Sequence, residues 1–313
     1  SASVTKPFPS SKKAVVCSQG INPNYSDIDT YHMAACTIDS AIRNAVAASG
    51  DVDYMALMDN FCWCSSDEKE RLGQLKKAVQ ACYDYATVYG TPFISGKDSM
   101  YNDFKGFDTE GNPVKISVPP TLLVSSLSVI EDAAKAISID SKFAGDLVYI
   151  IGETRNELGG SEYFAAQKIT DNNIPKVDAE KALALYRQFK KAVNKNMLAS
   201  AVSLEIGGLG IGLAKTAIAG MLGMEIDLQK VPQTSIDRND YLLFSETQTR
   251  FVVTIDPKRK KEFEKHFKDF TFAEIGRVTD DDVFTIKGAN GKELVHIPIP
   301  DLKDAYKKTF KGY

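Results

Sequence analysis

Two short segments in the first third of the chain combine residue types that bind phosphates and metal ions. The first is Leu57-Met-Asp-Asn-Phe-Cys-Trp63, where the run Tyr54–Leu57 predicts a short buried strand that ends at Asp59 and Asn60. A carboxylate in that place has a fixed backbone and reaches a cleft, so Asp59 is a candidate acceptor for a nucleotide hydroxyl or a ligand for Mg²⁺. A turn aspartate that caps the following loop is an equally good explanation.

The second segment is Thr91-Pro-Phe-Ile-Ser-Gly-Lys-Asp-Ser-Met100. Here Pro92–Ser95 predicts a strand that runs into a loop formed by Gly96, Lys97, Asp98 and Ser99. Such a loop offers backbone amides, a cation, a carboxylate and a hydroxyl within one turn, which is the set that phosphate binding needs. The segment does not fit the Walker pattern G-x-x-x-x-G-K-[ST]. A polar entry into a hairpin explains the same residues about as well.

Two glycine-rich segments occur later in the chain. Gly159, Gly160 and Ser161 follow the predicted strand Asp146–Ile151 and open a predicted helix. Free amides and the helix dipole there would attract an anion, although tight strand–helix packing is the alternative that the residues alone favour. The second segment, Glu205–Lys215, contains G-x-G-x-x-K, but no convincing strand precedes it. Small residues that allow close helix packing are the preferred interpretation.

Other kinds of chemistry have little support in the sequence. Cys62 and Cys64 lack the second cysteine pair or nearby histidine that would complete a zinc site. His32, His266 and His296 are far apart in sequence, and nothing places a nucleophile beside one of them.

Length and composition point to a cytoplasmic protein of two domains. The 313 residues suggest two domains of roughly 130–180 residues each. Lys and Arg (38) are balanced by Asp and Glu (41), which argues against a nucleic-acid surface. No apolar run approaches the ~20 residues that cross a bilayer, so no membrane partner is expected. The five cysteines all lie in the first third, unlike a secreted disulfide framework. The opening Ser1-Ala-Ser suggests a processed or cut fragment.

Helical and strand-like patterns alternate along the chain, which favours mixed α/β or α+β layers. Helices are predicted over 31–48, 68–89, 178–195 and 258–267, and the first two are closed by Gly50 and Gly90. Strands are predicted over 121–129, 240–245, 250–255, 284–287 and 294–298, with a hairpin turn over 108–112. Residues 1–12 are interpreted as a polar tail, and a linker-like stretch divides the chain near residue 135.

In this order, several segments resemble formylglycinamide ribonucleotide amidotransferase. The first four are Ile21-Asn-Pro-Asn-Tyr25, Asp39-Ser-Ala-Ile-Arg-Asn44, the Asp-Asn-Phe-Cys-Trp63 segment and the Ser-Gly-Lys-Asp-Ser99 segment. The others are Pro119-Pro-Thr-Leu-Leu123, Gly152-Glu-Thr154, Glu157-Leu-Gly-Gly-Ser161 and Phe244-Ser-Glu-Thr247 with Arg250-Phe. The resemblance extends from about residue 14 to the end of the chain.

This resemblance implies an α/β (α+β) fold of the aminoimidazole ribonucleotide synthase type, built in two tandem halves. Each half has an A domain whose strands join a shared barrel and a B domain of α/β-sandwich type. The chain corresponds to the second pair, with the A domain at residues 1–135 and the B domain at 136–313. The implied reaction is an ATP-dependent C–N ligation, in which formylglycinamide ribonucleotide, ATP and glutamine-derived ammonia give formylglycinamidine ribonucleotide for purine biosynthesis.

The same resemblance implies cofactors, partners and site residues. ATP and Mg²⁺ are the implied cofactors. The implied partners are the N-terminal half of the same synthase and a glutaminase subunit or domain, and a homodimer is expected if the barrel face is left uncovered. The candidate ATP- or substrate-binding residues are Asp59, Asn60, Gly96, Lys97, Ser99, Gly159, Gly160 and Ser161, with Asp98 as the candidate metal ligand.

The chain also departs from the family pattern. It lacks the Ser-Glu-His and His-Asn-His-Pro segments that supply most catalytic groups of first halves. Where a related B domain often has His-Asp-x-Ser-Asp-Gly-Gly, this chain has Val202-Ser-Leu-Glu-Ile-Gly-Gly208. We therefore expect no catalysis by this half alone. Two alternatives stay open: a non-catalytic nucleotide-binding half, and a homodimeric relative such as aminoimidazole ribonucleotide synthase or selenophosphate synthetase.

Overall fold

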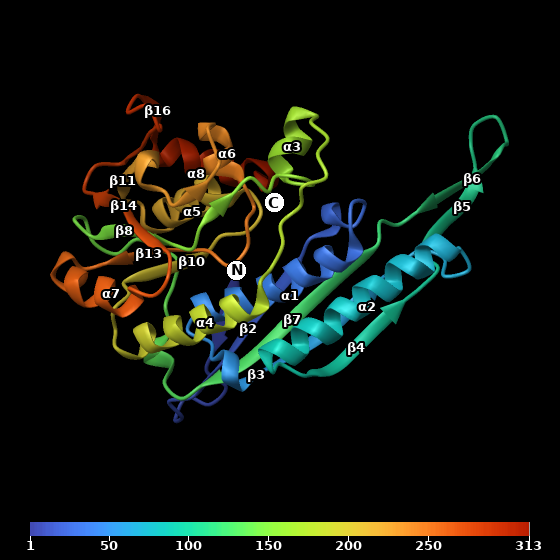
Figure 1. Ribbon diagram of the computed structural model, residues 1–313, viewed down its shortest axis with the longest axis horizontal. Coiled ribbons are helices and arrows are strands. Elements are labelled where there is room, and N and C mark those ends of the chain that lie inside the picture. Colours follow the sequence, from blue (N-terminus) through green and yellow to red (C-terminus); the bar gives the residue numbers. More distant parts are fainter. Residues whose placement is uncertain (313) are drawn as a thin grey trace. The chain divides into compact units, whose positions relative to one another are not determined.

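The computed structural model describes residues 1–312 and forms two compact units (Figure 1). The first unit comprises Ser1–Val46, Gly50–Ala133 and Gly159–Arg187. The second comprises Ala47–Ser49, Ala134–Leu158 and the chain from Gln188 onward. The second unit thus takes over close to residue 135, whereas Gly159–Arg187 packs with the first. The assignment of residues 1–135 and 136–313 as A and B domains stays a prediction.

A five-stranded sheet in the order β1-β2-β7-β3-β4 forms the first unit. Its strands are β1 (Ala2–Thr5), β2 (Ala14–Ile21), β7 (Thr121–Ile130), β3 (Met55–Cys62) and β4 (Phe93–Ser99). The pair β3 and β4 is parallel, and the other neighbouring strands are antiparallel. A parallel pair needs a long crossover between its strands, and helix α2 (Lys69–Tyr89) provides it.

One face of this sheet is covered by helices and the other is partly open. Along β7, Leu122 and Val124 are buried and alternate with half-exposed Leu123 and Ser125. Gly20 of β2 lies so close to helix α1 (Thr30–Ala47) that a Cβ there would lie 2.1 Å from the carbonyl oxygen of Thr37. The predicted helices over 31–48 and 68–89 are therefore confirmed as α1 and α2.

Three further elements complete the first unit. A hairpin of β5 (Asp103–Phe107) and β6 (Pro113–Ser117) extends past the end of the main sheet (Figure 1). The predicted turn over 108–112 closes it, because the Asp108 carboxylate accepts hydrogen bonds from the amides of Glu110 and Asn112, both at 2.9 Å. Helix α3 (Glu162–Gln167) follows, together with the first part of α4 (Ala179–Asn194).

A fully buried ion pair lies among the helices of the first unit. Asp39 and Arg43, one turn apart in α1, contact each other and are both 0% exposed. The hydroxyl groups of Tyr89 in α2 (2.7 Å) and Tyr186 in α4 donate to the same oxygen of Asp39. One carboxylate therefore connects three helices.

The second unit is built on a seven-stranded mixed sheet in the order β10-β13-β8-β14-β11-β15-β16. The pair β11–β15 is parallel and the other pairs are antiparallel. The strands are β8 (Leu147–Ile151), β10 (Ser200–Ser203), β11 (Gly223–Asp227), β13 (Phe251–Ile255), β14 (Phe272–Thr279), β15 (Val283–Lys287) and β16 (Glu293–Pro298). A small parallel pair joins β9 (Thr154–Arg155) to β12 (Gln233–Thr234).

Helices cover this second sheet unequally. Helices α5 (Gly208–Gly220), α6 (Asn239–Phe244) and α8 (Ile299–Lys307) share one apolar core with the sheet, to which α5 contributes Leu209 and Leu213. On the other face, Phe263 of α7 (Lys260–Phe267) packs on Tyr149 of β8, with ring centroids 4.7 Å apart. The part of that face over β14, β11 and β15 contains a hollow.

Several predicted elements were wrong or incomplete. Residues 1–12 are not simply a tail, because β1 pairs with β2 there. The predicted strand over 240–245 is helix α6; its apolar run of Tyr241–Phe244 fits either structure, and packing against α5 decides for a helix. Strands β10, β11 and β14 and helix α8 were not predicted. Within residues 1–312, no helix is both long and apolar enough to cross a membrane.

A buried acid makes the stability of the second unit depend on pH. Asp146 directly precedes β8 and is 4% exposed. Burial, and secondarily the charge of Asp256, raises the pKa of Asp146 to about 6. The folded chain therefore holds this proton more tightly, so the stability that Asp146 contributes is fully present below its unfolded pKa of about 3.9 and is lost as pH rises through about 6.

We expect Asp146→Asn to raise the free energy of unfolding by about 1–3 kcal/mol at pH 7.5, because the asparagine carries no charge to bury. The fall in stability between about pH 4 and pH 6 should also flatten. Calorimetric melts across this range measure both effects. Exposed Asp280→Asn is the control, and a variant profile that still falls like the wild type would refute the assignment.

Candidate functional site

The two segments singled out in the sequence lie side by side in the first unit, on the parallel strands β3 and β4. Asp59 lies opposite Gly96, Asn60 opposite Lys97, and Cys62 opposite Ser99. The predicted end of a strand at Asp59 and the predicted loop at Gly96–Ser99 are corrected: β3 continues to Cys62 and β4 to Ser99. Glycine, lysine and aspartate are poor strand formers, but pairing with β3 holds them extended.

The Asp59 side chain lies over Gly96. A Cβ on Gly96 would be 2.3 Å from Asp59 Oδ1 and 2.7 Å from Oδ2. Glycine is therefore the residue type that leaves room for this carboxylate. The packing gives a specific reason for a glycine inside the strand.

Strand alternation separates the candidate residues onto two faces of the sheet. Asp59, Gly96 and Asp98 are on the face that α2 covers, and Asn60, Lys97 and Ser99 are on the open face. On the open face, the Lys97 ammonium contacts the Ser99 hydroxyl. The predicted single turn that presents a cation and a carboxylate together is thus replaced by an acidic pair on one face and a cation–hydroxyl pair on the other.

On the face that α2 covers, burial and neighbouring carboxylates raise the pKa values of two side chains. Burial, and next the neighbouring Asp98 carboxylate, raises the pKa of Asp59. Burial also raises the pKa of the Cys82 thiol in α2 to about 12, with a further contribution from the charge of Asp59. Two nearby carboxylates without a cation favour the binding of a divalent ion or a proton.

Sequence reasoning missed the residue that joins the two segments. Asn102 donates from Nδ2 to the carbonyl oxygens of Trp63 (3.2 Å) and Ser99 (2.7 Å), and its backbone amide donates to Trp63 as well (3.0 Å). The Trp63 amide donates in turn to the Ser99 carbonyl oxygen at 2.7 Å. In the sequence, the feature that could have indicated this role was the side-chain amide of Asn102, three residues after Ser99.

The structure places Gly159, Gly160 and Ser161 elsewhere in the first unit. A Cβ on Gly159 would lie 2.7 Å from the amide of Asn173, and one on Gly160 would lie 2.9 Å from the Tyr25 ring. Ser161 caps α3 by accepting a hydrogen bond from the Phe164 amide at 3.2 Å. Their described contacts thus involve packing and capping, and a role in ligand binding stays a prediction.

The glycine-rich segment before α5 packs closely, as preferred from the sequence. A Cβ on Gly208 would lie 2.3 Å from the Ser245 carbonyl oxygen, and one on Gly212 would lie 2.3 Å from Leu204 Cδ2. The Gly207 amide donates to Glu246 Oε1 at 2.9 Å, so a carboxylate already occupies this helix N-terminus. An additional anion would be repelled there.

A buried arginine supports the loop that contains Glu246. Arg250 is 0% exposed and donates from Nε to the Thr247 carbonyl oxygen (2.8 Å) and from Nη2 to the Ser245 carbonyl oxygen (2.6 Å). Its Nη1 donates to the Thr154 hydroxyl at 2.8 Å. The guanidinium thereby fixes the loop against the strand pair β9–β12.

We expect Gly96→Ala to destabilise the first unit by about 1–3 kcal/mol and to displace the Asp59 carboxylate. Gly73→Ala is the matched control, because a Cβ there meets nothing within 4 Å and lies on exposed helix α2, where alanine is favoured. Trp63 is the single tryptophan and lies in the first unit, so its fluorescence in urea measures both changes. Equal stability of the two variants would contradict the packing described.

The chain is similar in sequence to known proteins. Residues 144–288 match the family model described as AIR synthase related protein, C-terminal domain. Phosphoribosylformylglycinamidine synthase subunit PurL of Methanocaldococcus jannaschii is 29% identical over 293 residues, which are 92% of this chain and 38% of that protein. The chain is thus similar to part of PurL. The PurL subunit of Thermoplasma volcanium is 28% identical over all 313 residues, which correspond to 39% of its length.

The fold agrees with that of a solved PurL. The structure of T. maritima PurL complexed with FGAR superimposes with a TM-score of 0.79 at 19% identity, over 96% of this chain and 47% of PurL. This likeness confirms the predicted α/β fold of the aminoimidazole ribonucleotide synthase type. The chain spans about two fifths of the length of the curated PurL relatives.

Proposed function

We propose that the chain acts as the C-terminal half of the synthetase component that makes formylglycinamidine ribonucleotide in cytoplasmic purine biosynthesis. Homology to PurL supports the pathway, and the T. maritima PurL structures complexed with FGAR and with ATP suggest the ligands. The observation that links the proposal to particular residues is the β3–β4 pair. In this pair, Asp59 lies on Gly96 and shares a face with Asp98.

In this proposal, the two faces of the β3–β4 pair bind different groups. Asp59 and Asp98 would hold Mg²⁺, which normally binds one or two carboxylates together with substrate phosphates and water. The two carboxylates share one face of the sheet, and the charge of Asp98 contributes to the raised pKa of Asp59, as expected for two acids that a cation could join. When bound, Mg²⁺ would supply positive charge on the face of the sheet that holds Asp59 and Asp98. On the open face, Lys97, Ser99 and Asn60 would donate hydrogen bonds to a phosphate group.

The reaction proposed for the complete synthase occurs in two steps. The amide oxygen of formylglycinamide ribonucleotide attacks the γ-phosphorus of ATP, which forms an O–P bond and releases ADP. Ammonia then attacks the activated carbon, and the C–O bond breaks with loss of phosphate. The residues of this chain would position phosphates and offset their charge, which is the main protein contribution to phosphoryl transfer.

Calorimetric titration of the purified chain with Mg-ATP and Mg-ADP tests the binding role. We expect Asp59→Ala to weaken binding by at least about tenfold and Ser99→Ala by a smaller factor, because each removes a charge or a hydrogen bond. Asp27→Ala is the control, since Asp27 is exposed and lies outside both strands. Binding that is equally tight in all three variants would exclude a nucleotide site at β3 and β4.

The remainder of the synthase is the proposed partner, with a glutaminase subunit or domain as the source of ammonia. The Val202–Gly208 segment contains a single acid, Glu205, so this chain offers few metal ligands of its own there. We therefore expect no product from FGAR, ATP and ammonium with the chain alone. Activity should appear when the N-terminal half of a related PurL is added.

One observation favours a second function, that of a non-catalytic nucleotide-binding half. Glu246 occupies the N-terminus of α5, a place in a helix where a phosphate could otherwise bind. If that function is correct, Asp59→Ala will abolish nucleotide binding and lower stability, but will leave the activity of the reconstituted synthase unchanged. A homodimeric relative acting alone would instead show ATP-dependent turnover without an added half.

Self-association is expected for the chain on its own. The open face of the five-stranded sheet exposes part of Met58, Leu123 and Leu127, and a hollow of about 510 Å³ extends over β1, β2, β3 and β7. Apolar strand faces of this kind are normally covered. We expect sedimentation velocity at micromolar concentration to show dimers or aggregates, and Leu127→Lys to shift the chain to monomers. A wild-type monomer at those concentrations would defeat this expectation.

A further inference from the structure

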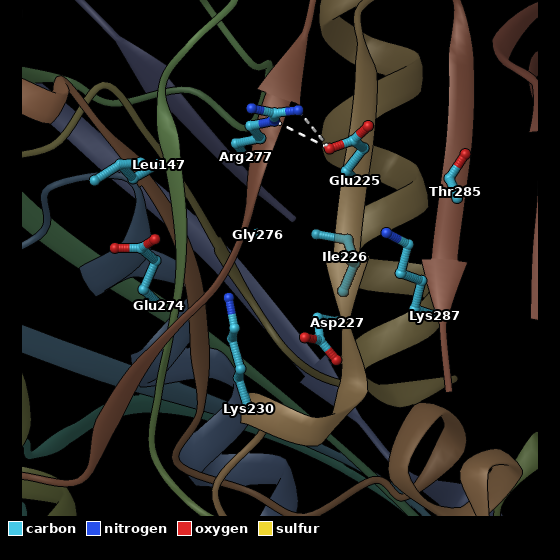
Figure 2. Close-up of a pocket in the computed structure, with 10 residues that line it drawn as sticks. All are labelled: Leu147, Glu225, Ile226, Asp227, Lys230, Glu274, Gly276, Arg277, Thr285 and Lys287. Carbon is cyan, nitrogen blue, oxygen red and sulfur yellow. Dashed lines mark hydrogen bonds and ion pairs between the residues drawn. The ribbon is translucent and has the colours of Figure 1, made fainter. Parts of the chain in front are cut away.

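The second unit has a hollow of about 400 Å³. It lies on the same face of the sheet as α7, over the part that α7 does not cover. Its walls come from β8, β14, β11, the turn after β11, and β15 (Figure 2). Strands hold most of its lining residues, so their positions are fixed by sheet hydrogen bonds. A volume of this size fits a small metabolite.

Of the three acidic side chains that line this hollow, Glu225 and Glu274 are paired with cations, and Asp227 is held by a backbone amide. Glu225 accepts hydrogen bonds from Arg277 Nε at 3.0 Å and forms an ion pair with its Nη2 at 2.8 Å. Glu274 binds Lys260 at 2.6 Å and the Tyr149 hydroxyl at 3.2 Å. Asp227 accepts a hydrogen bond from the backbone amide of Gln229 at 3.0 Å.

The two lysines of the hollow are not engaged in this way. Lys230 follows β11 and Lys287 ends β15, and Figure 2 shows both side chains directed into the hollow from opposite sides of Asp227. In the described part of the chain, neither ammonium has a hydrogen-bond or ion-pair partner. Two ammonium groups provide six donors, and the Thr285 hydroxyl adds one more on the same strand as Lys287.

We propose that this hollow binds the phosphate group of a small molecule between Lys230 and Lys287. Lysine is a point charge that suits a phosphate oxygen, and the pairing of Glu225 with Arg277 limits repulsion of the incoming anion. The site is in the second unit, separate from β3 and β4, and it does not depend on the function proposed for that strand pair. The phosphate could be inorganic or part of an organic phosphomonoester.

Amide chemical shifts of the ¹⁵N-labelled full chain test the proposal, with glycerol 1-phosphate, inorganic phosphate and glycerol as probes. We expect both phosphates to shift the amides of Asp227, Thr285 and Lys287, and binding to weaken as salt rises. A phosphomonoester site gives the tighter constant with glycerol 1-phosphate, and a free-phosphate site gives it with inorganic phosphate. No shift at these amides, or equal shifts with glycerol alone, overturns the proposal.

Paired variants show whether the two lysines are responsible. Lys230→Gln with Lys287→Gln should weaken binding of the preferred phosphate by at least about tenfold, because two charge-assisted hydrogen bonds are lost. Lys258→Gln with Lys292→Gln removes the same charge from exposed positions outside the hollow and should change the constant by less than about twofold. Equal weakening in both pairs would mean that only the overall charge matters, and the proposal would be wrong. Binding by Asp59→Ala should equal that of the wild type, which separates this result from the proposed function.

Discussion

Arg43→Met is expected to lower the free energy of unfolding of the first unit by about 3–5 kcal/mol. The substitution keeps most of the side-chain volume but leaves the Asp39 carboxylate, which is 0% exposed, without its cation. The hydroxyl groups of Tyr89 and Tyr186 can still donate to Asp39, but they do not neutralise its charge. Urea titration followed by Trp63 fluorescence measures the loss.

Two further variants separate the buried charge from the loss of a side chain. Arg187 pairs with Asp53 at 2.7 Å in the same unit, but both side chains are about half exposed, so Arg187→Met should cost at most about 1 kcal/mol. Asp39→Asn combined with Arg43→Met removes both charges and should recover part of the stability. An Arg43→Met variant as stable as Arg187→Met would show that the ion pair does not hold the helices together.

Arg250→Met is expected to cost the second unit a similar amount, about 3–5 kcal/mol. Three acceptors, namely the carbonyl oxygens of Ser245 and Thr247 and the hydroxyl of Thr154, lose their donor inside the protein. Each buried acceptor left without a partner costs about 1–3 kcal/mol. Calorimetric melting measures the effect, and limited proteolysis should show new cleavage within 245–250.

The matched control for this arginine is Arg277→Met. Arg277 also binds through two nitrogen atoms, to Glu225, but its side chain is 62% exposed and solvent can replace the contact. We expect a change of at most about 1 kcal/mol. Arg250→Lys is a second test, because a lysine keeps the charge but cannot reach three acceptors in fixed directions. If Arg250→Lys melts like the wild type, the directional hydrogen bonds described above are not important.

Local sequence patterns predicted the long helices well, for identifiable physical reasons. Helices α1 and α2 have apolar residues at helical spacing and are followed by Gly50 and by Gly90, whose φ of 69° ends α2. The seven-stranded sheet was only partly predicted. Strands β10 and β11 are short. They are extended because they pair with strands that are distant in the sequence, and their own residues give only a weak strand pattern.

Sequence reasoning singled out the residues of the β3–β4 pair but not their geometry, and their role as a site stays a prediction. Asp59 and Gly96 were singled out, and the structure places them opposite each other. Residues Gly96–Ser99 were interpreted as a loop, but they belong to strand β4. Successive side chains of a strand point to opposite faces, so Lys97 and Asp98 are separated. The buried charges were also missed, because an Asp and an Arg one turn apart in a helix are usually solvent-exposed. Here α2 and α4 pack over Asp39 and leave both charged side chains 0% exposed.

The strand order of the first unit also affects how the chain folds during synthesis. Strand β2 leaves the ribosome before its neighbour β7, which follows about a hundred residues later, since Ile21 pairs with Leu123. At a translation rate of about 5–20 residues per second, β2 and β3 wait several seconds for the strand that joins them. During this interval their apolar residues are open to chaperones and to neighbouring nascent chains. Slowing translation between residues 62 and 121 should therefore increase aggregation of the newly made protein.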